Sequence, residues 1–103
     1  GDAYVSLAGG IRIQEPAVDL GMVMAIVSSF KNRPVDESTV VFGEVGLSGE
    51  VRAVSLAEQR LQEAVKLGFT TCVMPKANAD MLKNTKSIKV IGVSNVQEAI
   101  ELI

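Results

Sequence analysis

The chain has 103 residues, of which 48% are apolar and 21% charged, and its formal net charge is −2. These values suit one folded domain, residues 1–103, and exclude a disordered chain or one that is basic throughout. The chain has no histidine and a single cysteine, so histidine catalysis and an internal disulfide are excluded. The longest apolar run, residues 20–27, is far shorter than the roughly 20 residues of a membrane span. We therefore expect a cytoplasmic protein that enters no membrane.

The first predicted element is an extended segment, residues 3–13, in which two adjacent glycines indicate a turn or bulge. A strand this close to the start indicates that an earlier part of the fold is missing. Residues 16–33 then predict a helix, because Pro16 suits a first helical turn and Pro34 ends the apolar run. The helix body is apolar nearly all round, so we expect it to be buried on most faces.

Two strands, residues 39–45 and 50–54, follow, joined by a glycine-rich turn at residues 46–49. A phosphate-binding loop is a weaker alternative for this turn. Such a loop needs a lysine followed by serine or threonine before a helix, whereas here Glu50 and a strand follow. A β-hairpin is therefore the better interpretation.

The second half of the chain alternates helices and strands. Ser55 and Glu58 have capping-box spacing at the start of a helix that runs to about Leu67, with Gly68 as its C-cap. The later elements are a strand, a short helix, a strand and a helix capped by Ser94 with Gln97: residues 70–74, 78–82, 88–93 and 96–103. The pattern predicts an α/β (α+β) fold, a mixed sheet with covering helices.

Several side chains could carry chemistry. Five carboxylates could form a metal site, but their spacing matches no known metal motif: Glu15, Asp19, Glu44, Glu50 and Glu58. Helix first turns and the flanks of the hairpin explain them better. Cys72 lies within an apolar strand and has no histidine to activate it, so we expect a core residue rather than a nucleophile.

Ser28 and Ser29 lie close to Lys31 and could form a serine–lysine pair. Nucleophile and base must also meet an oxyanion hole, and a single helix end does not supply one. The polar end of an apolar helix is the simpler interpretation of these residues.

The most basic part of the chain holds four lysines against one acid, Asp80: Lys76, Lys83, Lys86 and Lys89. A basic edge on an acidic chain can hold phosphates by charge. The alternative is a solvated helix and strand end, and no aromatic residues lie between these lysines to stack on bases. We assign the four lysines as candidate DNA contacts.

Two segments, residues 14–19 and 49–61, resemble the proteolytic domain of Lon-type proteases. In that family the first segment carries a nucleophilic serine and the second its partner lysine. The matching positions here are Ala17 and Glu58. Alanine has no nucleophile and glutamate cannot act as the lysine amine. The resemblance therefore implies a Lon-like fold whose protease chemistry is lost, with no catalytic residue in this chain.

The resemblance extends, over nearly the whole chain, to the Lon-like C-terminal domain of the RadA (Sms) family of bacterial DNA repair proteins. The segments that carry it are residues 9–13, 15–20, 28–35, 41–52, 58–61 and 66–69. It implies an N-terminally truncated piece of a DNA-dependent ATPase that acts in recombination and branch migration. A zinc finger and a RecA-like ATPase would lie outside this chain, so zinc, ATP and magnesium are expected only there.

The expected function is thus a non-proteolytic scaffold that supports a ring, expected to be hexameric, and contacts DNA. Two alternatives stay open: an active peptidase with a displaced serine–lysine pair, and an oligomerisation module that makes no DNA contact. Neither a cofactor nor a metal is expected in this domain.

Overall fold

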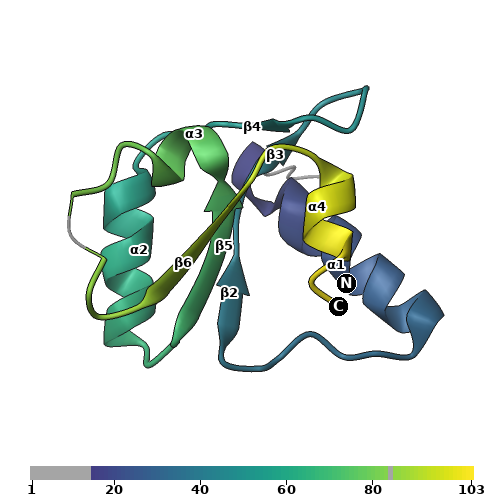
Figure 1. Cartoon of the computed structure of the whole chain (residues 1–103), viewed down its shortest axis with the longest axis horizontal. Coiled ribbons are helices and arrows are strands. Elements are labelled where there is room, and N and C mark those ends of the chain that lie inside the picture. Colours follow the sequence, from purple (N-terminus) through teal and green to yellow (C-terminus); the bar gives the residue numbers. More distant parts are fainter. Residues whose placement is uncertain (1–14, 84) are drawn as a thin grey trace, which may run out of the picture.

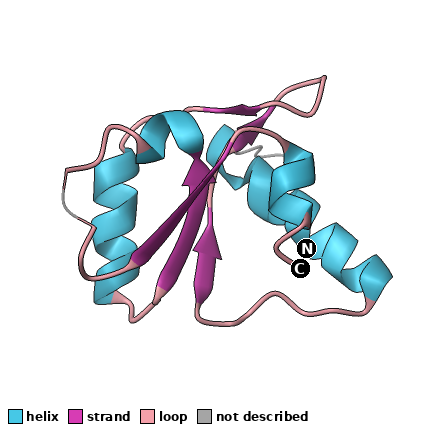
Figure 2. Cartoon of the chain, in the orientation of Figure 1, coloured by secondary structure: helices cyan, strands magenta, loops and turns pink. Residues whose placement is uncertain are grey.

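The computed structural model describes residues 15–83 and 85–103. Its centre is a parallel sheet of three strands, β2 (Thr39–Val41), β5 (Thr71–Pro75) and β6 (Lys89–Val93), in the order β2-β5-β6. Helix α2 (Ala57–Lys66) covers one face, and α1 (Asp19–Lys31) with α4 (Val96–Ile100) covers the other (Figures 1 and 2). The predicted α/β class is confirmed. The predicted segment 3–13 lies outside the described residues.

The side chains of strand β5 point alternately to the two faces of the sheet and divide the core into two clusters. Cys72 and Met74 pack toward Leu61 of α2, while Val73 packs toward Leu20 and Met24 of α1. Successive side chains of a strand point to opposite faces, so an unbroken apolar run suits a strand covered on both sides. All six side chains are at most 4% exposed, which makes β5 the centre of the fold.

Strand pairing differs from the prediction of one mixed sheet. Among the described residues, the antiparallel pair β3 (Glu44–Val45) and β4 (Val51–Arg52) forms a separate small sheet. The expected continuous strand 39–45 is therefore wrong. Phe42 and Gly43 interrupt it because the Gly43 N–H donates to the carbonyl of Ala17 (2.8 Å).

The predicted hairpin turn is confirmed. The Gly46 N–H donates to the carbonyl of Glu50 (2.8 Å), and Gly49 adopts a φ of 84°, which glycine tolerates best. The second strand is shorter than predicted because Val54 leaves the ladder. Its N–H and carbonyl instead bond to the side-chain amide of Asn78, at 2.9 and 3.0 Å.

Helix α1 begins after a 3₁₀ turn, η1 (Pro16–Val18), and ends at Asn32, whose φ of 55° is left-handed. Its position confirms the prediction, but the expected burial on most faces is wrong. Only Leu20 and Met24 of α1 are buried. Four apolar side chains spaced by four residues stay exposed, and we call them the α1 stripe: Val18, Met22, Ile26 and Phe30.

Both predicted capping boxes are wrong. Helix α2 starts after Leu56, which has a φ of 61°, and no side chain caps it. Helix α4 is capped one residue later than expected, by Asn95, whose side chain accepts from the Glu98 N–H (2.9 Å). The backbone of Ser94 is already engaged, because its carbonyl accepts from Val51 N–H. Gly68 follows α2 with a φ of 93°, as its predicted C-cap role requires.

The remaining boundaries are close to prediction. Helix α3 (Lys76–Ala79) begins two residues before the expected segment 78–82, directly after β5. Helix α4 ends at Ile100, before the expected end at Ile103. Within residues 15–83 and 85–103, no helix has the length and apolar character that crossing a membrane requires.

Candidate functional site

The turn that carries Ala17 is fixed against the end of the parallel sheet. Ala17 is 3% exposed, and its carbonyl accepts from the Gly43 N–H. The Leu20 N–H donates back to the Gly43 carbonyl (2.9 Å), and the Val18 N–H closes the turn on the Glu15 carbonyl (3.1 Å). A small side chain suits this enclosed position, while a reactive group would need space for a substrate beside it.

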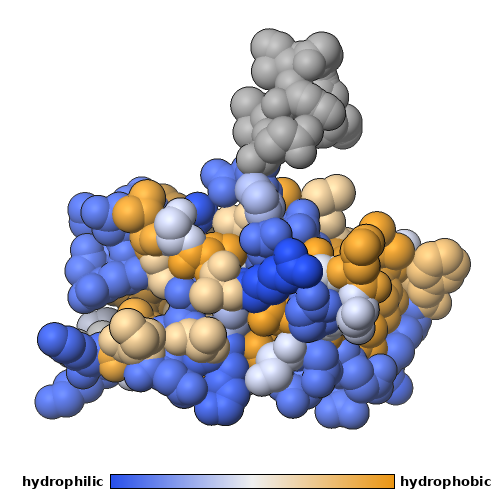
Figure 3. Space-filling view, turned by 90° about the horizontal axis from the view of Figure 1, so that it is seen from above, coloured by the Kyte–Doolittle hydropathy of each residue, from blue (hydrophilic) through white to orange (hydrophobic). Residues whose placement is uncertain are grey.

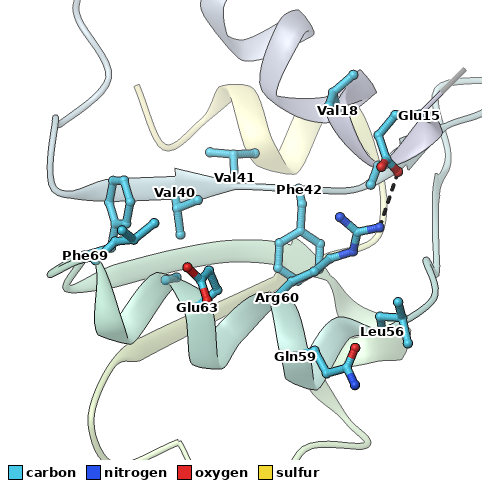
Figure 4. Close-up of a pocket in the computed structure, with 13 residues that line it drawn as sticks. Glu15, Val18, Val40, Val41, Phe42, Leu56, Gln59, Arg60, Glu63 and Phe69 are labelled. Atoms are coloured by element: carbon cyan, nitrogen blue, oxygen red, sulfur yellow. Dashed lines mark hydrogen bonds and ion pairs between the residues drawn. The ribbon is translucent and has the colours of Figure 1, made fainter. Parts of the chain in front are cut away.

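A groove of about 600 Å³ runs beside this turn, between β2 and α2 (Figure 4). Its lining is largely apolar: Glu15, Ala17, Val18, Val40, Val41, Phe42, Leu56, Gln59, Arg60, Glu63, Ala64, Leu67 and Phe69. Among these, Val18, Leu56 and Leu67 are 48%, 61% and 68% exposed. We call this feature the β2 groove.

Arg60 is the basic group among the described residues that line the β2 groove, beside the carboxylates of Glu15 and Glu63. Its guanidinium lies 6.0 Å from the centre of the Phe42 ring, within cation–π range. Its Nη2 reaches Glu15 at 3.3 Å (Figure 4). Its Nε donates to the Ser55 carbonyl at 3.0 Å. Arg60 therefore ties α2 to the segment that enters η1.

Ala17 and Glu58, the two positions that the resemblance to Lon-type proteases matched to a serine and a lysine, do not share a pocket. Ala17 lines the β2 groove and a smaller pocket of about 150 Å³, and Arg60 lines both with it. Glu58 lines a different pocket with Leu61, Gln62, Thr85 and Ser87, among others. Helical residues two apart point in directions about 200° apart, which explains why Glu58 and Arg60 lie on different sides of α2.

Arg60 is the residue of this site that the sequence reasoning missed. The sequence carries a signal for it, because the apolar Leu61 and Ala64 are the residues that α2 buries against the sheet, and Arg60 lies next to Leu61 and one turn before Ala64. A guanidinium stays protonated and cannot accept a proton from a nucleophile. The β2 groove can therefore hold polar and apolar groups, and none of its described lining residues is a serine, threonine, cysteine or lysine.

The displaced serine–lysine candidates lie at the far end of α1 from this groove. The Ser28 hydroxyl donates to the Arg33 carbonyl, and the Arg33 N–H donates to the Ser28 carbonyl (3.0 Å). These bonds close the end of the helix where Asn32 turns left-handed. The hydroxyl of Ser28 thus has a structural partner in the loop.

The structure separates the four candidate lysines into two places. Lys76 begins α3 at the carboxyl end of β5, where its Nζ lies 3.1 Å from Asp80. Lys89 starts β6 and pairs in register with Thr71 at the opposite end of that strand pair. Lys83 and Lys86 lie in the connection between α3 and β6, which passes α2 (Figure 1). Three lysines thus follow one connection, and the fourth lies apart.

Cys72 lies in the core, as its sequence context indicated. Its side chain is 0% exposed, and burial raises the pKa of the thiol to about 12. A thiol with that pKa is almost entirely protonated near neutral pH, so it is a poor nucleophile.

The carboxylates of the hairpin are held by an arginine. Arg52 Nη2 lies 2.7 Å from Glu50 and its Nη1 lies 3.6 Å from Glu44. The hydrogen bond from Arg52 lowers the pKa of Glu50. Asp19 accepts from the Val45 N–H (3.2 Å), which joins α1 to the same hairpin. In the part of the chain that the structure describes, no three histidine, cysteine or acidic residues form a potential metal site.

Comparison with known proteins identifies the family. A family model described as "Subunit ChlI of Mg-chelatase" matches residues 3–78. The DNA repair protein RadA of Bacillus subtilis (strain 168) is 52% identical over 99 residues, and that of Halalkalibacterium halodurans is 50% identical over 101 residues. The DNA repair protein RadA of Synechocystis sp. (strain PCC 6803) is 48% identical over 99 residues.

These alignments cover 96%, 98% and 96% of this chain but only 22%, 22% and 19% of the relatives. The chain thus spans about a fifth of the length of the curated relatives it matches. The chain belongs to the ChlI family and is homologous to part of the bacterial DNA repair protein RadA.

Proposed function

We propose that this domain is a non-proteolytic, Lon-like scaffold of a RadA-type DNA repair protein. In this proposal it supports assembly of a ring in the cytoplasm, where the whole protein uses ATP to drive recombination and branch migration. Zinc, magnesium and ATP would be bound by parts of the protein outside this chain. The proposal is supported by homology to RadA along nearly the full chain.

The α1 stripe is the observation that carries the scaffold role. Its members Met22, Ile26 and Phe30 are 58%, 55% and 87% exposed. The apolar area at the right end of Figure 3 corresponds to the end of the molecule where Figure 1 places the second half of α1. An apolar row along one helix is the kind of surface that protein contacts cover. A head-to-tail contact repeated around an axis would close a ring.

The stripe can be tested in the whole protein that carries this chain, by measuring its mass in solution with and without nucleotide and DNA. Ile26→Asp is expected to reduce the oligomer to smaller species, because it places a charge in the centre of the contact. Ala25→Asp is the matched control, since it adds the same charge at an exposed position of α1 outside the stripe. An unchanged mass for both Ile26→Asp and Phe30→Asp would contradict the scaffold role.

Loss of protease chemistry is the second part of the proposal. Neither Ala17 nor Arg60 can perform the proton transfer of a serine–lysine pair, and Ser28 bonds to a loop carbonyl. The peptidase alternative would require Ser28 or Ser29 to be activated by a base brought from elsewhere. An oligomerisation module without DNA contact remains the second candidate. Measuring DNA binding after substitution of Lys83 and Lys86 would distinguish it from the DNA-contacting scaffold.

A further inference from the structure

Strand β6 forms the edge of the described sheet opposite β2, with β5 as its neighbour (Figure 1). The Lys89 N–H donates to the Thr70 carbonyl (3.0 Å), so Lys89 and, by alternation, Ile91 direct their backbone groups toward β5. Val90 and Gly92 therefore direct theirs outward, and Gly92 is exposed. Among the described residues, no other strand or loop bonds to the backbone of Val90 or Gly92.

An open strand edge of this kind can accept an extended peptide as an added strand. Val90 and Gly92 each offer one N–H and one C=O, and a single antiparallel segment can pair with both residues. In this mode of recognition the main-chain hydrogen bonds provide affinity. Contacts of alternate side chains with the surface beside the edge provide specificity.

An apolar hollow lies beside this edge, on the face of the sheet that α1 and α4 cover, and we call it the Ile91 hollow. It measures about 360 Å³, and β6 contributes Ile91 to its lining. Its other apolar lining residues come from α1, the following loop, β5 and the end of the chain: Met24, Pro34, Val35, Val73, Leu102 and Ile103. Directly opposed residues of paired strands lie about 5 Å apart on the same face. A partner side chain opposite Ile91 can therefore enter the hollow.

The charged groups beside the Ile91 hollow favour an acidic partner. Lys89 is exposed and lies two residues before Ile91, so the two share one face of β6. Arg33 lines the hollow, and no acid of the described residues forms an ion pair with Lys89 or Arg33. The one acid in the described lining, Asp36, accepts from the Ser38 N–H (2.7 Å).

We propose that β6 accepts an extended segment of a partner protein as an antiparallel fourth strand. The segment carries an apolar residue opposite Ile91 and, two residues later, an acidic residue opposite Lys89. This order follows because an antiparallel strand passes Ile91 before it reaches Lys89. The antiparallel direction is chosen because antiparallel pairs are slightly more stable per residue than parallel ones. The inference goes beyond the scaffold and DNA-contact roles and depends on neither.

Amide hydrogen exchange on the whole protein that carries this chain tests the open edge. The probe is a seven-residue peptide, capped at both ends, that alternates threonine with valine, leucine and aspartate in that order. The amides of Val90 and Gly92 should exchange readily without the peptide and on the order of 10-fold more slowly with it. The Ile91 amide, which faces β5, should change little. Slow exchange of Val90 without peptide, or no binding at about 1 mM peptide, would overturn the proposal.

Two methylated forms of the same peptide test the register without any change to the protein. N-methylation of the threonine between leucine and aspartate removes the N–H that would donate to the Val90 carbonyl. It should weaken binding by about 5- to 10-fold, because one hydrogen bond is lost. N-methylation of the leucine is the matched control, since the N–H opposite Ile91 points away from β6. Equal affinities of the two methylated peptides would contradict the assigned pairing.

A charge exchange tests the contact with Lys89. Lys89→Glu should weaken binding of the aspartate peptide by on the order of fivefold. It should strengthen binding of a peptide in which lysine replaces the aspartate. Lys83→Glu makes the same charge change away from the edge strand and should have a smaller effect on both peptides. Equal effects of Lys83→Glu and Lys89→Glu would mean that only net charge attracts the peptide, which would overturn the assigned contact.

Discussion

At the scale of single residues, the direction of each side chain around α2 decides what lies next to Ala17. Arg60 enters the β2 groove, and Glu58 lines a pocket with Thr85 and Ser87 on another side of the helix. The spacing of a motif along the sequence therefore did not predict which two side chains meet. Which of two residues two positions apart meets Ala17 depends on which side of α2 is buried against the sheet.

This placement predicts the result of an attempt to rebuild a dyad. Ala17→Ser with Glu58→Lys is expected to give no peptide cleavage, because the hydroxyl and the amine would line different pockets. The assay is cleavage of an unfolded protein substrate, compared with Ala17→Ser with Arg60→Lys, which puts both groups at the β2 groove. Cleavage by the Glu58→Lys pair would contradict the assigned placement.

The loss of stability expected for Glu58→Lys alone is small. A capping box between Ser55 and Glu58 would have made this substitution costly, but no side chain caps α2. The remaining contribution of Glu58 is its charge in the first helical turn. Reversing that charge should lower the free energy of unfolding by no more than about 1 kcal/mol.

At the scale of elements, α3 and β6 approach each other closely at one glycine. A Cβ atom on Gly92 would lie 3.0 Å from the Cα of Lys76 and 3.1 Å from the Cβ of Ala79. The first contact is with backbone, which cannot rotate away. Gly92 therefore allows the short helix to pack directly on the strand that follows it.

Gly92→Ala is expected to destabilise the domain by about 1–3 kcal/mol, because α3 would have to move away from β6. Gly21→Ala is the control. Its Cβ would meet the Val41 carbonyl at an ordinary 3.5 Å, and alanine favours a helix interior over glycine by about 1 kcal/mol. The midpoint of denaturant unfolding should therefore fall for Gly92→Ala and rise for Gly21→Ala. A neutral Gly92→Ala would show that α3 does not depend on this close contact.

Element identities could largely be predicted from the sequence, whereas the burial of α1 and the N-caps of α2 and α4 could not. The apolar run of β5 and the turn at Gly46 carry strong local signals, and both are confirmed. The end of β2 depends on the distant Ala17, and the cap of α4 moves to Asn95 because the Ser94 carbonyl bonds to Val51. Such long-range hydrogen bonds leave no pattern in the local sequence.

At the scale of the whole molecule, surface chemistry is unevenly distributed. The part of the α1 stripe formed by Met22, Ile26 and Phe30 belongs to α1, which covers the face of the sheet opposite α2 (Figure 1). Lys83 and Lys86 lie in the connection that passes α2 and leads to Lys89 at the start of β6 (Figure 1). A scaffold that also contacts DNA needs two surfaces that do not compete. The separation of these two features across the sheet is compatible with both contacts being made at once.

The DNA-contact role predicts a specific change in salt dependence for the whole protein. Lys83→Glu with Lys86→Glu should weaken duplex binding for all sequences alike. It should also reduce the slope of log affinity against log salt by about 2, because two phosphate contacts are lost. Lys31→Glu with Lys66→Glu changes net charge equally but lies on α1 and α2, so its slope should stay near that of the unsubstituted protein. Equal slopes for all three proteins would exclude the 83–89 connection as a DNA contact and favour the module that only oligomerises.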